Sequence, residues 1–236
     1  MKNKTKAIGF DFDGTLIMSE QQKAKVMVDI FRESFQIKTG VTQAYQKASL
    51  LGLNREQKIK TIFQNVFHRQ PTKKEFTIIT NQFSRRYQQS MNTCPLFQCT
   101  NMIKELRNQV KFIFLLSLEN KREVAAIAQH CGVARYFNEI LGGPKSKVEN
   151  LRHLLHRHNL KPVEVLYIGD AHSDVIASKK LKIKVVLLGK KHTYEKLKED
   201  LEADFRFSSL CDLPKNIFKW KTQPPQAAGY KKRSTQ

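Results

Sequence analysis

The chain has 236 residues, of which 40% are apolar, and a formal net charge of +21. This length suffices for one α/β domain and a small accessory domain with a buried core. No apolar run reaches the roughly 20 residues of a membrane span, and the first apolar run is too short for an export signal, so we expect a cytoplasmic protein. The positive charge favours anionic ligands without identifying them.

The first predicted strand is the apolar run 7–10, which leads into Asp11, Asp13 and Gly14. An apolar run that ends in acids and a glycine is typical of a buried strand followed by a loop. Over residues 18–93 the apolar positions change to helical spacing, so about four helices are expected there.

Beyond residue 95 the pattern alternates between helices and strands. The predicted helices cover 101–109, 121–130, 148–158 and a segment after 174, and the predicted strands cover 111–116, 165–168 and 184–188. Repeated units of strand and helix with apolar strands indicate a parallel sheet covered by helices on both faces, which is a Rossmann-like α/β fold.

This alternation divides the chain into three parts. Residues 1–17 and 94–214 form the predicted α/β core, and residues 18–93 form an inserted helical unit after the first strand. Residues 215–236 carry six Lys or Arg and no acid, with little apolar periodicity. We expect them to form a basic, disordered tail.

Polar residues gather at the predicted carboxyl ends of the strands, where parallel sheets bind ligands. The first strand delivers Asp11 and Asp13, the second delivers Ser117, and a third delivers Asp170 and Asp174 within 169–174; Lys147 precedes a helix. Carboxylates and a lysine in one loop layer fit a hard cation and an anionic substrate. The sequence therefore predicts a Mg²⁺ and phosphate site.

The same residues, in the same order, resemble the haloacid dehalogenase-like superfamily. Its members carry Asp-x-Asp-Gly-Thr-Leu, then a Ser or Thr, then a Lys, then Gly-Asp-x-x-x-Asp, and the four motifs stand here at 11–16, Ser117, Lys147 and 169–174. The resemblance extends over about residues 5–214. It is nearest to the phosphoglycolate phosphatase and β-phosphoglucomutase group, in which a helical cap follows the first strand.

The resemblance implies a Mg²⁺-dependent phosphatase for a small phosphorylated metabolite. Asp11 would be the nucleophile that forms an aspartyl-phosphate, and Asp13 the general acid and base. Asp11, Asp170 and the backbone carbonyl of Asp13 would hold the metal. Ser117 and Lys147 would neutralise the phosphoryl oxygens.

Four further positions carry weaker expectations. Asp174 would orient Lys147 or metal-bound water, and Gly14 belongs to the first motif. Leu118 departs from the family, which often has Asn after the Ser or Thr, so that a side-chain contact is missing while the backbone N–H remains. Arg55, at the start of a predicted cap helix, resembles an arginine that meets a distal anionic part of the substrate.

Several alternatives stay open at this point. Lys145 competes with Lys147 as the phosphate lysine. A phosphomutase or a polynucleotide end phosphatase would use the same residues, and a pseudoenzyme would keep them without catalytic activity. The charge and the tail also fit a non-catalytic protein that binds nucleic acid or another polyanion, but no strip of aromatic residues interleaved with Lys or Arg supports this. The oligomeric state is not readable.

Cysteine usage bears on the compartment. The four cysteines are Cys94, Cys99, Cys131 and Cys211, with neither zinc-site spacing nor the density of a disulfide scaffold. We therefore expect buried or idle thiols in a reducing cytosol.

Overall fold

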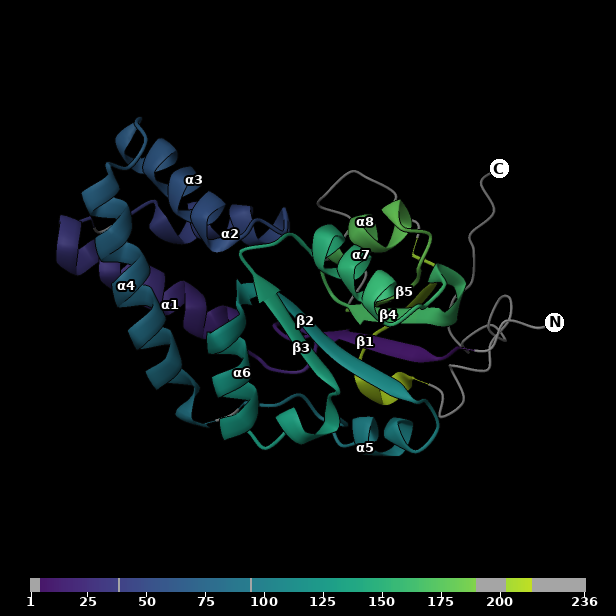
Figure 1. The fold of residues 1–236 in the computed structure, drawn as a ribbon. Helices are drawn as coiled ribbons and strands as arrows, with labels where there is room; N and C mark the ends of the chain where they lie inside the picture. The colour runs from purple at the N-terminus through teal and green to yellow at the C-terminus, as the bar shows by residue number, and fades with distance from the viewer. Residues whose placement is uncertain (1–4, 38, 94, 190–202, 214–236) are drawn as a thin grey trace, which may run out of the picture.

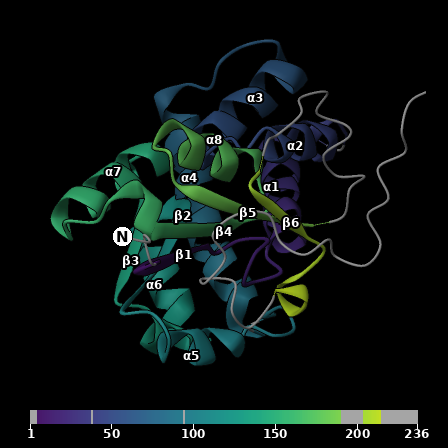
Figure 2. The ribbon, with the colours of Figure 1, turned by 90° about the vertical axis from the view of Figure 1, so that its right-hand side faces the viewer.

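The structure, a computed structural model, describes residues 5–37, 39–93, 95–189 and 203–213. Its centre is a six-stranded parallel sheet with the strand order β3-β2-β1-β4-β5-β6 (Figures 1 and 2). The strands are β1 (Ala7–Asp11), β2 (Phe112–Asn120), β3 (Glu139–Gly143), β4 (Val165–Gly169), β5 (Lys184–Leu188) and β6 (Phe205–Phe207). Because β1 lies between β2 and β4, its carboxyl end lies in the middle of the ligand-binding edge.

The strands are buried on both faces, and their alternation divides the core into two clusters. Ile8 and Phe10 of β1 belong to the cluster on one face, whereas Ala7 belongs to the cluster on the other face. This is the period of two that a strand imposes on its side chains. Apolar residues on both faces explain why these strands occur in the sequence as unbroken apolar runs.

Helices cover both faces of the sheet. They are α5 (Met102–Arg107), α6 (Lys121–His130), α7 (Lys147–Arg157) and α8 (His172–Lys180). In Figure 1, α7 and α8 lie above the sheet and α5 and α6 below it. The predicted α/β fold with helices on both faces is therefore confirmed.

Between β1 and β2 the chain forms a separate helical block, which lies beyond the carboxyl end of the sheet (Figure 1). Its helices are α1 (Glu20–Phe35), α2 (Val41–Leu50), α3 (Arg55–Phe67) and α4 (Lys73–Ser90). Asn54 and Thr72 cap α3 and α4 in reciprocal capping boxes with Gln57 and Glu75, which define where each helix begins. The expected number of about four helices is confirmed.

Aromatic packing holds the block together. Phe31 and Phe35 of α1 meet Phe63 and Phe67 of α3, with ring centroids 4.9–6.4 Å apart among the four rings. The buried members of this group belong to the same apolar cluster as the face of the sheet that carries Phe10. Block and sheet thus share one continuous core in this structure.

The structure departs from the sequence-based expectations at two strands and at the cysteines. No strand was expected at β3 or β6, which are short segments on the outer side of the sheet. Cys99 forms a disulfide with Cys211, and Cys131 is also disulfide-bonded. The prediction of idle thiols was therefore wrong. Cysteines far apart in sequence give no local sign of pairing, because the fold alone brings them together.

Two remaining expectations concern the ends of the chain and membranes. The tail 215–236 lies outside the described residues. Across the described ranges, no helix is both long enough and apolar enough to span a bilayer.

Candidate active site

Asp11 is the last residue of β1 and lies at the centre of the site. It is 4% exposed, and its Oδ1 lies 2.7 Å from the Nζ atom of Lys147, the first residue of α7. Ser146 caps α7, so the helix begins where Lys147 faces the end of β1. Lys147 Nζ also lies 2.5 Å from Asp174 Oδ1, and this buried lysine thus joins two acids.

Three carboxylates converge beside Lys147. Oxygen atoms of Asp11, Asp170 and Asp174 all lie within 4.8 Å of one another. Burial raises the pKa of Asp11 well above its ordinary value, and Asp174 and Asp170 add to this effect against Lys147. Burial and then Asp174 raise the pKa of Asp170 to about 7. The group therefore carries more negative charge than Lys147 balances, as a site for a hard divalent cation does.

The loop after β1 approaches Asp170 closely. Gly14 has a φ of +79°, and a Cβ at this position would overlap the Asp170 carboxylate. Thr15 Oγ1 donates a hydrogen bond of 3.1 Å to Asp170 Oδ1. The glycine of the first motif is thus required both by the backbone conformation and by the neighbouring acid.

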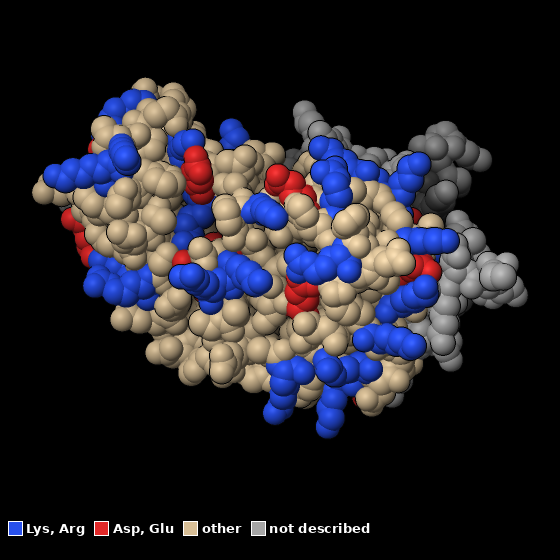
Figure 3. Space-filling model, in the orientation of Figure 1, with Lys and Arg blue, Asp and Glu red and all other residues tan. Residues whose placement is uncertain are grey.

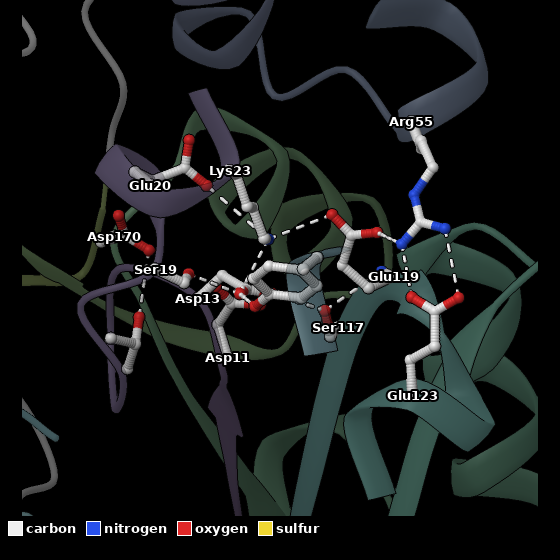
Figure 4. A network of polar contacts seen from close by, with 12 residues as sticks. Asp11, Asp13, Ser19, Glu20, Lys23, Arg55, Ser117, Glu119, Glu123 and Asp170 are labelled. Carbon is white, nitrogen blue, oxygen red and sulfur yellow. Dashed lines mark hydrogen bonds and ion pairs between the residues drawn. The ribbon is translucent and has the colours of Figure 1, made fainter. Parts of the chain in front are cut away.

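Asp13 has a different environment from Asp11. Its carboxylate accepts hydrogen bonds from Ser19 Oγ at 2.6 Å, Tyr87 Oη at 2.9 Å and Ser117 Oγ at 3.0 Å, and Lys23 Nζ lies 2.7 Å away (Figure 4). Burial raises the pKa of Asp13, but Lys23 and the hydrogen bonds outweigh burial and leave the pKa below its ordinary value. Asp13 is therefore held as a carboxylate.

A chain of ion pairs leads from Asp13 to the helical block. Lys23 of α1 lies 3.0 Å from Glu119 of β2, and Glu119 lies 2.6 Å from the guanidinium of Arg55 in α3 (Figure 4). Arg55 also lies 2.5 Å from Glu123 of α6. These contacts connect the block to the sheet and to one of the two motif acids.

A cavity of about 560 Å³ opens between the helical block and the edge of the sheet. This volume is typical of a site for a small molecule. Six of the predicted site residues line the cavity, namely Asp11, Asp13, Ser117, Leu118, Lys147 and Asp170. Asp174 and Arg55 are not in the lining: Asp174 is buried against Lys147, and Arg55 is bound by Glu123 and by Glu119, which does line the cavity.

The predicted exception at Leu118 is visible in the structure. Leu118 is half-buried in the cavity wall, and the next backbone N–H, that of Glu119, donates to Ser117 Oγ at 3.1 Å. Ser117 donates in turn to Asp13. An apolar side chain thus stands in the wall beside Ser117.

Sequence reasoning missed four residues of the site, which are Lys23, Lys58, Tyr87 and Glu119. The two lysines carried a readable signal, because each lies in the apolar stripe of its helix. The buried residues of α1 begin with Lys23 and continue with Val26, Met27, Ile30 and Phe31. A charge on the buried face of an amphipathic helix indicates a polar partner inside the fold.

The fold and the site together define a Rossmann-like α/β protein with a buried aspartate, a buried lysine and a candidate cation site at the carboxyl edge of its sheet. Comparison with known sequences agrees with this class. The sequence model described as haloacid dehalogenase-like hydrolase matches residues 8–188. The chain belongs to this family.

Two curated relatives are called phosphoglycolate phosphatase. The one from Mannheimia succiniciproducens is 24% identical over 231 residues, which cover 92% of this chain and the whole relative. The one from Vibrio vulnificus is 32% identical over 82 residues, so the chain spans 36% of that relative's length.

Solved structures show the same fold. A predicted phosphoglycolate phosphatase from Haemophilus somnus superposes with a TM-score of 0.74 at 20% identity, covering 88% of this chain and 96% of that one. A β-phosphoglucomutase from Clostridium difficile superposes with a TM-score of 0.72 at 18% identity, covering 91% and 97%. CbbY from Rhodobacter sphaeroides, bound to xylulose-1,5-bisphosphate, superposes with a TM-score of 0.71 at 16% identity, covering 89% and 96%.

Proposed function

We propose that this protein is a Mg²⁺-dependent phosphatase that hydrolyses a small phosphate monoester, with Asp11 as its nucleophile. The observation that carries the proposal is the position of Asp11 in a small-molecule cavity, 2.7 Å from Lys147 and within 4.8 Å of two further carboxylates. The names of the relatives are consistent with this reaction.

The donors present fit Mg²⁺, because carboxylate oxygens are its preferred ligands. Burial, together with the neighbouring carboxylates, raises the pKa of Asp11 and Asp170, and a bound cation would offset both effects. Asp11, Asp170 and the backbone carbonyl of Asp13 would hold the ion, and Asp174 would orient Lys147. When bound, the ion would neutralise charge on the phosphoryl oxygens and shield Asp11 from repulsion by the substrate.

In the first step, a carboxylate oxygen of Asp11 attacks phosphorus, and the bond from phosphorus to the ester oxygen breaks. Asp13 donates a proton to the departing oxygen. Lys23 lowers the pKa of Asp13 in the free protein, but an anionic phosphate beside it would raise that pKa and so favour the protonated form. Lys147 and the Ser117 hydroxyl would stabilise the charge on the phosphoryl group.

In the second step, water attacks the phosphorus of the aspartyl-phosphate. Asp13, now the carboxylate, accepts a proton from this water, and the Asp11 carboxylate leaves as phosphate is released. The contacts of Asp13 with Lys23 and Ser19 stabilise the base form that this step needs.

We further propose that residues 18–93 act as a cap that selects the substrate and that residues 1–17 and 94–214 form the catalytic core. The cavity lies between these two parts, and cap closure would exclude water. A cavity covered in this way favours a small metabolite over a polynucleotide. Lys and Arg are also scattered over the face in Figure 3 rather than gathered in one strip. This distribution is typical of a generally basic protein and does not favour a dedicated nucleic-acid-binding surface.

Phosphate release from a panel of sugar phosphates, nucleotides, phosphoglycolate and an aryl phosphate tests the proposal. We expect release that requires Mg²⁺, stops with EDTA and is lost in Asp11→Asn, with the circular dichroism of the folded protein retained. Conversion of a sugar phosphate into its isomer without release would favour a phosphomutase. No reaction, combined with salt-sensitive binding to arbitrary oligonucleotides, would favour the polyanion binder.

The cytoplasmic location expected from the sequence remains a prediction, and the Cys99–Cys211 disulfide argues against it. Disulfides persist in oxidising compartments and are rare in a reducing cytosol.

A further inference from the structure

Three lysines of this site are buried, and they differ in their partners. Lys147 lies 2.7 Å from Asp11, and Lys23 lies 2.7 Å from Asp13. Lys58 of α3, which is 8% exposed, lies 3.9 Å from its nearest carboxylate, that of Glu20. Within the described part of the chain, no hydrogen bond joins Lys58 Nζ to another residue.

The contact between Lys58 and Glu20 is a weak one. Glu20 is 43% exposed at the side chain, so water screens its charge, and it also lies 3.7 Å from Lys23. The Lys58 ammonium lies 4.8 Å from the ring centroid of Tyr45, a contact that stabilises the charge without saturating its three N–H donors. Burial lowers the pKa of Lys58, as expected for a cation with incomplete compensation.

Lys58 also has the right place for a ligand. It lines the same cavity as Asp11, together with Tyr45 and Asn54 of the helical block. The two terminal nitrogens of Arg55, the predicted substrate contact, are bound by Glu119 and Glu123 instead, and Arg55 does not line the cavity; its buried Nε has no hydrogen-bond partner among the described residues. Lys58 is only 8% exposed and lines a cavity with unused N–H donors, so an anion or water is needed there to satisfy them.

We infer that Lys58 binds a second anionic group of the substrate, either a carboxylate or a second phosphate. This inference rests on the proposed function and narrows it: the preferred ester is a phosphate monoester with a second negative charge at its distal end. The phosphate to be removed would lie beside Asp11, and the second anionic group would lie beside Lys58 of α3, in the same cavity. Lys58 is a specificity residue and takes no part in the bond-breaking steps.

Matched substrate pairs test the inference. The first pair is phosphoglycolate and the analogue in which an amide replaces the carboxylate, and it tests for recognition of a carboxylate. The second pair is a hexose bisphosphate and the hexose monophosphate, and it tests for recognition of a second phosphate. We expect the wild type to prefer the more anionic member of at least one pair by tenfold or more in kcat/KM. Lys58→Met should abolish that preference and leave the rate with the less anionic member within about threefold, and Lys58→Arg should restore it.

Two controls separate this role from others. Lys60→Met removes an exposed lysine of the same helix and should leave the preference unchanged. Arg55→Lys tests the competing cation. Loss of the preference in Arg55→Lys with retention in Lys58→Met would overturn the inference, as would equal use of both members of each pair by the wild type.

Binding provides a readout that does not depend on turnover. Calorimetric titration measures the affinity of the same compounds for Asp11→Asn, with and without Lys58→Met. The difference between the two proteins gives the contribution of Lys58 to binding the second anionic group. Tighter binding of the more anionic member that disappears with Lys58→Met supports the inference, and its absence overturns it. If wild-type protein releases no phosphate from any ester, the proposed function fails, and the titration still decides whether Lys58 binds the second anion.

Discussion

At the scale of single residues, the two motif acids show how environment divides roles between identical side chains. Burial and the neighbouring carboxylates raise the pKa of Asp11, whereas Lys23 and the hydrogen bond from Ser19 outweigh burial at Asp13 and lower its pKa. Asp11 is the last residue of β1, whereas Asp13 lies in the loop beyond the strand, so the path of this loop places the two acids beside different partners. Asp11 is suited to bind a cation, and Asp13 is suited to accept a proton.

The pKa of Asp170, raised to about 7, predicts how Mg²⁺ binding depends on pH. Between the ordinary value near 4 and about 7, the folded state holds this proton more tightly than the unfolded chain, so the metal-free protein loses stability as pH rises through that window. Mg²⁺ requires the carboxylate, so we expect its affinity to be about tenfold lower at pH 6 than at pH 8. The Mg²⁺-induced shift in Tm at both pH values measures this. Equal affinities would contradict it, and Asp170→Asn should bind Mg²⁺ poorly at either pH.

Gly14 offers a second test at this scale. In Gly14→Ala the new Cβ overlaps the Asp170 carboxylate and the backbone keeps a φ of +79°, so we expect a loss of about 1–2 kcal/mol in stability and at least a tenfold loss of phosphatase activity. Gly132→Ala is the matched control, because its φ is +70° but no atom lies within 4 Å of the new Cβ. This control should lose stability to a similar extent and keep its activity. Equal activity in both variants would contradict a role of Gly14 in placing Asp170.

At the scale of elements, α3 connects the helical block to the sheet. Arg55 contacts Glu119 of β2 and Glu123 of α6, and it lies over the ring of Phe83 in α4. Its partners come from three elements that are distant in sequence. The first turn of α3 therefore joins the block to the strand that also carries Ser117.

Replacing Arg55 should cost stability because two acids lose their shared partner. We expect Arg55→Met to lower the free energy of unfolding by about 2–3 kcal/mol. The loss is not larger because Glu119 retains its ion pair with Lys23 and Glu123 retains its hydrogen bond from Ser84. Lys60→Ala removes an exposed ion pair with Glu56 on the same helix and should cost less than about 0.5 kcal/mol. Urea denaturation of both variants measures the difference. A small, equal loss in the two would show that Arg55 does not hold the block to the sheet.

At the scale of the whole molecule, the disulfide joins two distant parts of the chain. Cys99 follows the helical block and Cys211 lies in the last described helical turn, 112 positions later. A crosslink over so long a segment restricts the unfolded chain strongly. It also places a constraint across most of the α/β core.

Removal of this disulfide should therefore destabilise the protein. For a loop of this length, chain entropy predicts a loss of about 4–5 kcal/mol, and measured losses are often smaller. We expect Cys99→Ala with Cys211→Ala to lower the Tm of the oxidised protein clearly. Thiol titration of the unfolded wild type checks the premise: four reactive thiols without reductant would contradict the disulfide and support the cytoplasmic prediction.

The sequence alone determined the class of fold and the position of the motif residues. Apolar runs that end in acids predicted β1 and β4, and helical spacing predicted the block between β1 and β2. These signals are local, because burial on both faces of a strand requires a continuous apolar run. The convergence of Asp11 and Asp170 followed from the rule that parallel strands end at one edge, whereas Lys147, which follows the unpredicted β3, was expected there from the family motif.

Tertiary structure decided which side chains meet across long separations. Arg55 had the local context of a substrate contact, but the docking of α3 against β2 and α6 gives it Glu119 and Glu123. The pairing of Lys23 with Asp13 and of Cys99 with Cys211 depends in the same way on distances that no local pattern encodes. Lys58 is the clearest case: its place in the apolar stripe of α3 indicates burial, but only the packed structure shows that no carboxylate of the described residues lies closer to it than 3.9 Å.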